Sequence, residues 1–481
     1  MTSSRRRLGL ANPFLLLILP IIPISVYYVF LSEESTLLKN SEGVRKRESD
    51  NVTGIEKHAS QPHHADVTDD TESCLLQPHC IRQRAAEWAR PWADRPNSTW
   101  LARFPNYESL LEHSRIKAKE YENGKGKVPC GLLYVKVPKT ASSTIAGVAL
   151  RISRRHNATV RYQHALAWEE NYGNRDKEKS YLFASIRDPA ERILSSLSFR
   201  ASVKERPLSE SDILQSLKFN SEELPQSYVP VAGRGGLQVV YVSLSSIPKY
   251  SVWNPQHPSS VQMPERVHQL VHDIVDSYDF LLVSERLEES LVAMSILMRI
   301  PISDILVLST KVANRSNKDE ADEVVGDVNW YLVPGRNQKS PPKCVQLHSI
   351  RKPLAPSIQQ YFESEEWRAK VYVDLLLHEV AQQSLNLTIQ VIGQRRFEGA
   401  LATYRQLSTK ASEICRFDNH NVQFQCSPDG HPQEQIAQQF CYDDDMGCGH
   451  VCIDEMLLSS QYDEHVNEEE QRQDNFNEDD Y

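Results

Sequence analysis

The sequence predicts an α/β fold: a doubly wound parallel sheet with flanking helices, preceded by a transmembrane anchor and followed by a Cys-rich appendage. Three observations support this prediction. Apolar segments typical of buried strands alternate with segments of helical periodicity between residues 130 and 310. An apolar span near the N-terminus is long enough to cross a bilayer. Five cysteines gather between residues 415 and 452.

The expected elements follow one another in α/β order. Apolar runs predict strands, and runs with apolar residues at helical spacing predict helices. Ligands of such a sheet bind at the carboxyl ends of its strands. The expected strands are 130–137, 180–189, 278–285 and 304–310; the expected helices are 142–156, 190–203, 264–278 and 286–300, with a mostly helical region over 356–415.

The overall composition permits a large core and argues against one class of partner. Hydrophobic residues make up 40% of the 481 residues and charged residues 25%, as in ordinary globular proteins. The formal net charge is −10, and nucleic acid binding needs a basic surface. We therefore expect no nucleic acid partner, although a local basic pocket for an anion remains possible.

The N-terminus predicts a membrane anchor. Three arginines close a short cytoplasmic tail, residues 1–7, and an apolar span follows over residues 8–31. Basic residues on the N-terminal side favour a cytoplasmic N-terminus with the rest of the chain translocated. A cleaved signal peptide is the alternative, but no small-residue cleavage site ends the span.

Beyond the anchor, the composition divides the chain into four parts. Residues 32–125 are polar and weakly periodic, which predicts a lumenal stem. Residues 126–395 form the expected main domain, and residues 396–458 a helical and Cys-rich extension. The acidic segment 459–481 is expected to be a disordered tail.

Two further features suit a chain that enters the secretory pathway. Asn-x-Ser/Thr acceptors occur at Asn51, Asn97, Asn157, Asn314 and Asn386. The chain has nine cysteines, which in an oxidising lumen predict disulfides with one cysteine left over. A zinc site is the alternative for the C-terminal cysteines, but their spacing is not a familiar ligand pattern.

The loop after the first expected strand carries the residues of an anion site. In "VPKTASST", Lys139 and four hydroxyl residues stand between a strand and a helix. Such a loop presents backbone N–H groups and the positive end of a helix dipole. The arrangement is P-loop-like but lacks both glycines of G-x-x-x-x-G-K-[ST], so we expect a phosphate group here rather than a nucleoside triphosphate. The alternative is a capped helix start with a solvated lysine.

A second segment, "SIRDPAERILSS", offers another anion-binding pair. Arg187 ends an expected strand, and Ser195 lies about two turns into the helix that follows, with Arg192 and Ser196 beside it. A guanidinium and a helix hydroxyl can hold a phosphate from two directions. The alternative is an exposed Arg187–Asp188 pair and a helix serine without a special role.

Together the two segments resemble the paired signatures of the sulfotransferases, enzymes that use 3′-phosphoadenosine 5′-phosphosulfate (PAPS). The resemblance covers about residues 130 to 315. Within the family, "KTASST", "YDFLLVSERLEESLVAM" and "DILVLSTKVANR" most resemble the Golgi galactose 3-O-sulfotransferases. The resemblance implies that the 5′-phosphosulfate binds Lys139, Thr140, Ala141, Ser142, Ser143 and Thr144, and that the 3′-phosphate binds Arg187 and Ser195.

The implied reaction transfers a sulfuryl group from PAPS to a hydroxyl of a carbohydrate acceptor. Lys139 would stabilise the charge on the leaving oxygen, and a base would take the acceptor proton. The resemblance places that base between the two motifs, where His164 is the first candidate and Glu169 or Glu170 the alternatives. Glu285 ends an expected strand and could line the same cleft or form an ordinary salt bridge. No metal is expected.

Two other functions compete with a membrane-bound Golgi carbohydrate sulfotransferase. A phosphotransferase on a similar core would bind ATP and depend on Mg²⁺. A lumenal glycan-binding or adaptor protein with a decayed nucleotide site would not be an enzyme, but the joint presence of Lys139, Arg187 and Ser195 argues against decay. The acceptor sugar, the oligomeric state and the disulfide pairing are left open by the sequence.

Overall fold

A four-stranded parallel sheet lies at the centre of the described part of the chain. The computed structural model describes residues 74–93, 129–156, 158–163, 167, 172–206, 208–218, 241–244, 264–308, 330–333, 341–347, 350, 353–415, 426–427, 429–433 and 449–458. The strands are β1 (Gly131–Val135), β2 (Val160–Gln163), β3 (Ser180–Ile186) and β4 (Phe280–Val283), in the order β2-β1-β3-β4. All three pairings are parallel. The prediction of a parallel sheet is confirmed.

Three of the four strands are buried along their whole length, as their unbroken apolar sequences predict. Every residue of β1, β3 and β4 is buried. Strands covered on both faces read as continuous hydrophobic runs rather than alternating ones. Helices therefore have to cover both faces of the sheet.

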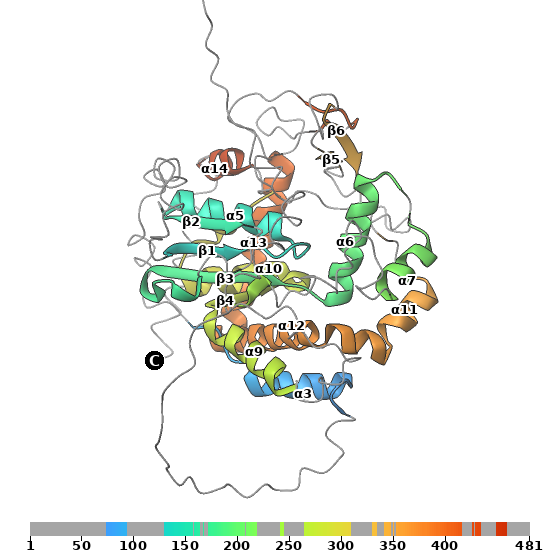
Figure 1. The fold of residues 1–481 in the computed structure, drawn as a ribbon. Coiled ribbons are helices and arrows are strands. Elements are labelled where there is room, and N and C mark those ends of the chain that lie inside the picture. The colour runs from blue at the N-terminus through green and yellow to red at the C-terminus, as the bar shows by residue number, and fades with distance from the viewer. Residues whose placement is uncertain are drawn as a thin grey trace, which may run out of the picture. The chain divides into compact units, whose positions relative to one another are not determined.

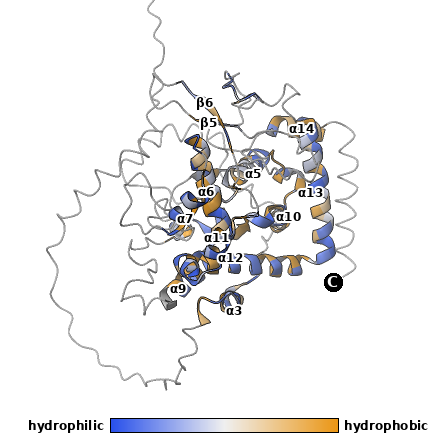
Figure 2. Ribbon diagram, turned by 90° about the vertical axis from the view of Figure 1, so that its right-hand side faces the viewer, coloured by the Kyte–Doolittle hydropathy of each residue, from blue (hydrophilic) through white to orange (hydrophobic). Residues whose placement is uncertain are grey.

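Helices surround the sheet (Figure 1). Helix α5 packs against β1 and β2, α12 against β3 and β4, α10 against β4, and α9 against α12. Figure 2 shows that α12 and α13 carry both hydrophobic and hydrophilic residues along their length, as helices with one buried face do. The α-helices are α3 (Pro78–Trp88), α5 (Ser142–Arg155), α6 (Pro189–Val203), α7 (Glu210–Lys218), α9 (Pro264–Ser277), α10 (Leu287–Met298), α11 (Pro356–Phe362), α12 (Glu365–Ile392), α13 (Gln394–Ile414) and α14 (His450–Leu458).

One expected element is wrong, and others were not foreseen. The expected strand 304–310 begins instead as the 3₁₀ helix η8 (Ile302–Ile305), directly after Pro301. The buried carboxylate of Asp304 forms ion pairs with Arg155 and His156, which holds this segment in a tight turn. Strand β2 and the antiparallel hairpin of β5 (Trp330–Val333) and β6 (Lys343–Gln346) are additional to the predicted elements. The remaining 3₁₀ helices are η4 (Tyr172–Asn174), η5 (Lys177–Lys179) and η7 (Ser284–Arg286).

Part of the predicted stem is folded against the main domain. Helix α3 packs on α12, and the backbone N–H of Trp92 donates to Oγ1 of Thr388 over 2.9 Å. Trp92 is buried. Thr388 belongs to the glycosylation acceptor at Asn386, which lies on α12 and accepts a hydrogen bond from Arg286. The Asn-x-Thr pattern at this site thus has a packing role.

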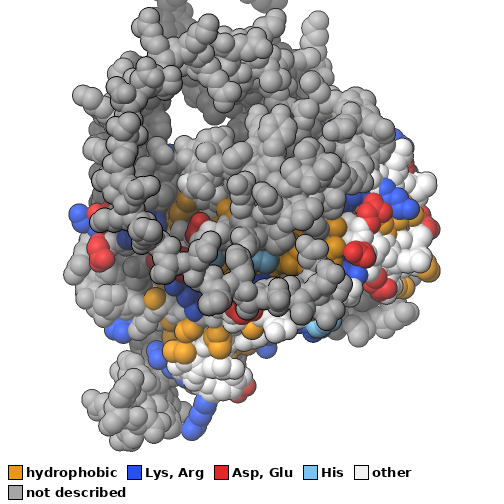
Figure 3. Space-filling view, turned by 60° about the horizontal axis from the view of Figure 1, so that its bottom comes forward, with side chains coloured by type: hydrophobic (Ala, Val, Ile, Leu, Met, Phe, Trp, Pro, Cys, Tyr) orange, Lys and Arg blue, Asp and Glu red, His pale blue; other side chains and the backbone are white. Residues whose placement is uncertain are grey.

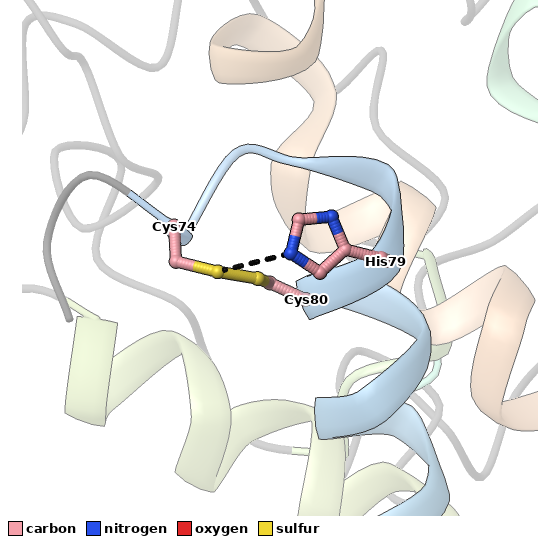
Figure 4. A group of neighbouring side chains, drawn as sticks. All are labelled: Cys74, His79 and Cys80. Carbon is pink, nitrogen blue, oxygen red and sulfur yellow. Dashed lines mark hydrogen bonds between the residues drawn. A yellow bond between two sulfur atoms is a disulfide. The ribbon is translucent and has the colours of Figure 1, made fainter. Parts of the chain in front are cut away.

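Disulfides join segments that are distant in the sequence. Cys344 of β6 is bonded to Cys426, and Cys415 at the end of α13 is bonded to Cys452 of α14. The prediction of disulfides is confirmed for these four cysteines. A third bond, Cys74–Cys80, lies at the start of α3 beside His79 (Figure 4).

Three of the expected segments lie outside the described residues. These are the anchor over residues 8–31 with its tail 1–7, and the acidic segment 459–481. Among the described helices, none combines the length and apolar character that a membrane span requires. On the face drawn in Figure 3, described Lys and Arg side chains are interspersed with Asp and Glu side chains and with hydrophobic ones.

Candidate active site

The loop between β1 and α5 adopts a glycine-like conformation without glycine. Lys139 and Ala141 have φ values of 67° and 58°, in the left-handed region that non-glycine residues rarely occupy. Thr140, between them, is buried, and its hydroxyl donates to the carbonyl of Val137 over 2.9 Å. It also lies 2.5 Å from the hydroxyl of Ser185 on β3. These contacts pin the loop to the sheet and hold the unusual backbone in place.

The loop leads directly into the N-terminus of α5. Ala141 is the residue before the helix and provides no side-chain cap, and the first turn contains no acidic residue. Ser142 is buried, whereas Ser143 and Thr144 are partly exposed. The first backbone N–H groups of a helix need partners from outside it, and the helix dipole favours a negative one. The start of α5 is thus suited to bind an anion.

The ammonium group of Lys139 lies over an aromatic ring instead of a carboxylate. Its Nζ is 3.2 Å from the centroid of the Phe199 ring on α6. Burial, and to a smaller extent the positive charges of Arg200 and Arg187, lower the pKa of Lys139 to about 7. An anion bound at this loop would relieve both effects, because it would compensate the lost solvation and the repulsion.

Arg187, at the end of β3, contacts the same loop. Its Nη1 donates to the carbonyl of Lys139 over 3.1 Å. Its Nη2 lies 3.5 Å from a carboxylate oxygen of Glu191, and its Nε lies 3.7 Å from Glu285. The structure therefore brings together the two predicted anion-binding segments, which are about fifty residues apart in the sequence.

Glu285 links the loop after β3 to α12. One carboxylate oxygen accepts the backbone N–H of Asp188 over 2.9 Å, and the other lies 3.2 Å from Nε2 of His378. Burial raises the pKa of Glu285, but the hydrogen bond and charge of His378, together with the backbone N–H groups of Asp188 and Glu285, outweigh it, so the pKa is lowered overall. An ionised carboxylate at this position fixes the turn that carries Arg187.

One face of α6 completes the site. Arg192, Ser195 and Phe199 follow the i, i+3, i+7 spacing of one helix face, and Phe199 places that face against Lys139. Arg192 is 5% exposed, its Nε has no hydrogen-bond partner among the described residues, and its Nη2 lies 4.0 Å from a carboxylate oxygen of Asp374. Burial lowers the pKa of Arg192, and Asp374 opposes that shift.

The sum of these contacts is a local excess of positive charge at the ends of β1 and β3. No described carboxylate lies within ion-pair distance of Lys139. A buried guanidinium nitrogen without a partner and a lysine with a lowered pKa both indicate a site for an anionic ligand. The two anion-binding segments, joined by the contact between Arg187 and Lys139, offer positions for two anionic groups.

The structure adds residues to the predicted anion site, but it does not describe the residues predicted to act as the base. Phe199, Arg200, Asp374 and His378 were not foreseen as part of it. The helical spacing from Arg192 to Phe199 was the signal that could have identified Phe199, whereas the contacts of α12 with the strand ends depend on the fold. His164, Glu169 and Glu170 lie outside the described residues, so the prediction of the base stays a prediction.

A comparison with known protein families agrees with this geometry. Residues 129–324 match the family model described as the sulfotransferase family. The matched region contains the loop, Arg187 and the four strands, and it covers less than half of the chain. It supports sulfuryl transfer in general and an assignment as a transferase enzyme. No curated protein and no solved structure matches the chain.

Proposed function

We propose that this protein transfers the sulfuryl group of PAPS to a hydroxyl of a carbohydrate acceptor. One observation carries the proposal: Lys139 and Arg187 stand at the ends of adjacent parallel strands and are joined by a 3.1 Å hydrogen bond. Ligands of doubly wound sheets bind at this edge. Sulfotransferases generally use PAPS as the donor, whose two phosphate-bearing positions match the two anion-binding segments.

The donor would bind along the β1–α5 loop and α6. The 5′-phosphosulfate would contact Lys139, the loop backbone and the hydroxyls of Ser143 and Thr144. The 3′-phosphate would contact Arg187 and Ser195. Thr140 would act mainly through its backbone, since its hydroxyl is held by Val137 and Ser185.

The reaction follows from this placement. The acceptor hydroxyl oxygen attacks sulfur in line with the leaving group, and a new S–O bond forms as the bond to the 5′-phosphate oxygen breaks. The acceptor proton passes to a base, for which His164 is our first candidate and Glu169 or Glu170 the alternatives. Negative charge develops on the departing phosphate of 3′,5′-ADP, and the Lys139 ammonium group stabilises it.

We also propose a location and a subfamily. The protein would be a single-pass type II protein of the Golgi membrane, anchored by residues 8–31, with its catalytic domain in the lumen. The disulfides of the described chain are consistent with an oxidising compartment. The short motifs around Lys139 and Glu285 favour a galactose 3-O-sulfotransferase, and no resident metal is required for the proposed chemistry.

The test is sulfate transfer by the purified full-length chain. Radiolabelled PAPS is supplied with a panel of neutral glycosides, and product is separated by chromatography. We expect label to enter at least one glycoside without added Mg²⁺. ATP binding with Mg²⁺-dependent phosphate transfer, and no sulfate transfer, would instead indicate a phosphotransferase.

A further inference from the structure

A cavity lies beside α6, next to the proposed donor site. Its volume is about 700 Å³, which is within the range of small-molecule sites. The walls come from α6, from the segment before and within α7, from the β5–β6 hairpin and from the start of α11. These elements are brought together from distant parts of the sequence.

The cavity and the donor loop share the α6 wall. Ser198, Ala201 and Ser202 of α6 line the cavity, and Phe199 between them lies under the ammonium group of Lys139. The Phe199 ring also meets Tyr331 edge-on, with 5.1 Å between centroids. Tyr331 follows Trp330, which lines the cavity. A ligand in the cavity is thus one layer of side chains from the group that would hold the sulfuryl donor.

The lining is mostly apolar. Leu208, Ile213, Val345, Ile350 and Ile358 form much of it. Apolar lining favours a ligand that buries hydrocarbon surface on binding. A ligand made only of sugar hydroxyls would leave this surface poorly matched.

The positive charge at the cavity is already paired within the described chain, and one carboxylate there has only a hydroxyl as its partner. Glu205 is paired with Lys343 over 2.8 Å, and Arg206 with Asp212 over 3.0 Å. Glu210 accepts a hydrogen bond from the hydroxyl of Ser357. An acidic polysaccharide would therefore find no excess of positive charge here, in contrast to the donor loop.

Trp330 provides a firmly held aromatic surface. Gly430 approaches it so closely that a Cβ atom at that position would lie 2.6 Å from the indole ring, and Gly430 has φ +79°. The Cys344–Cys426 disulfide fastens the neighbouring strand to the segment that contains this glycine. Aromatic rings present an apolar face with well-defined geometry, which suits the C–H face of a neutral sugar.

We propose that this cavity binds the acceptor, and that the acceptor is a neutral sugar joined to an apolar aglycone. The sugar would lie at the Trp330 end, nearest Phe199 and Lys139. The aglycone, an alkyl or lipid-like group, would lie among Ile213, Ile350 and Ile358. This inference rests on the proposed function, because it assigns the second substrate of the same reaction.

The test compares matched pairs of glycosides on the full-length chain. Methyl and octyl glycosides of the same neutral sugars are assayed with radiolabelled PAPS, below the micelle concentration of the octyl compounds. We expect the octyl glycoside to have a KM at least about tenfold lower, since each buried methylene adds to binding. An octyl glucuronide, which carries a carboxylate, is expected to bind at least about tenfold more weakly than the neutral octyl glycoside.

Variants that fill the cavity give a second readout. Ala201→Phe on α6 and Ala355→Phe at the opposite wall should raise the KM of the octyl glycoside at least about tenfold while leaving 3′,5′-ADP affinity unchanged. Ala402→Phe, at an exposed position of α13, is the matched control and should change neither. Equal KM values for the octyl and methyl compounds, or cavity variants that stay folded with unchanged KM, would overturn the inference.

Direct binding separates this inference from the proposed function. Octyl glycoside binding is measured by calorimetry with and without 3′,5′-ADP. If 3′,5′-ADP binds but no glycoside does, the cavity inference is wrong and the donor site stands. If 3′,5′-ADP does not bind, the proposed function fails. In that case, octyl glycoside binding that is lost in Ala201→Phe would still support a glycoside cavity. If the parent chain did not bind octyl glycoside, the cavity inference would be overturned.

Discussion

The two ends of α5 use positive charge in opposite ways. At its C-terminal end, Arg151 is almost fully buried; it forms an ion pair with Asp454 at 2.7 Å, and its Nε donates to the carbonyl of Ser303 over 3.0 Å. Arg155 also pairs with Asp454, over 3.1 Å. At its N-terminal end, Lys139 faces Phe199 and other cations. The paired charges of Arg151, Arg155 and Asp454 stabilise the packing of α14 on α5. The positive charge of Lys139, which has no paired carboxylate among the described residues, is typical of a site that binds an anion.

The sharpest test of this contrast is Lys139→Met, which removes the charge and keeps the apolar stem. We expect sulfate transfer to fall by about 10²–10³-fold, as when one stabilising group of a transition state is removed. The melting temperature should stay the same or rise, because a poorly solvated cation is lost. Activity assays and thermal denaturation of the same preparation check both. A stable variant with full activity would show that Lys139 has no part in the chemistry.

The corresponding change at the other end, Arg151→Met, should act on stability instead. We expect the free energy of unfolding to fall by about 2–3 kcal/mol, since Asp454 and the carbonyl groups of Ser303 and His450 lose a charged partner. Denaturant titration measures this, and 3′,5′-ADP affinity of the folded variant should be unchanged. Unchanged stability would mean that the Arg151–Asp454 pair does not hold α14 in place.

The sequence predicts those parts of the two ends of α5 that depend on neighbouring residues. It does not predict the parts that depend on contacts between residues far apart in the sequence. The apolar run before Lys139 and the helical spacing after it predicted β1 and α5 correctly. The left-handed backbone at Lys139 and Ala141 depends on Thr140 meeting Ser185, forty-five residues later, and the pairing of Arg192 with Asp374 spans an even longer separation. Contacts of this kind follow from the packing of the fold, so a local pattern does not reveal them. The candidate bases His164, Glu169 and Glu170 lie outside the described residues.

The lowered pKa of Lys139 predicts proton uptake on ligand binding. In the free protein this pKa is about 7, so above pH 7 the amine is mostly neutral. A bound anion raises the pKa, so the amine gains a proton between pH 7 and the new value. Calorimetry of 3′,5′-ADP binding at pH 8 in buffers of different ionisation enthalpy should show uptake of up to about one proton.

The pH dependence and the variant provide the controls for this effect. At pH 6 the amine is already protonated in the free protein, so the uptake should be small. Uptake at pH 8 should disappear in Lys139→Met. Uptake that persists in the variant would assign the proton to another group.

We expect a smaller effect on ligand affinity from substituting Glu285, whose carboxylate holds the turn that carries Arg187. Glu285→Gln keeps the shape of the side chain but removes the charge that faces Arg187 and His378. We expect 3′,5′-ADP to bind about five- to tenfold more weakly, in line with the loss of one charge-assisted hydrogen bond. Glu288→Gln, whose partner is the exposed Arg405, is the matched control. Equal effects of the two substitutions would rule out a positioning role.

The central claim is that the β1–α5 loop and Arg187 form a site for a nucleotide phosphorylated at its 3′ and 5′ positions. The most direct measurement is calorimetric titration of the full-length chain, Lys139→Met and Arg187→Ala with 3′,5′-ADP and with 5′-AMP. The account predicts that the parent binds 3′,5′-ADP at least about tenfold more tightly, that Lys139→Met weakens both ligands, and that Arg187→Ala removes only the preference. A folded parent chain that binds neither ligand, or variants that bind both as the parent does, would contradict it.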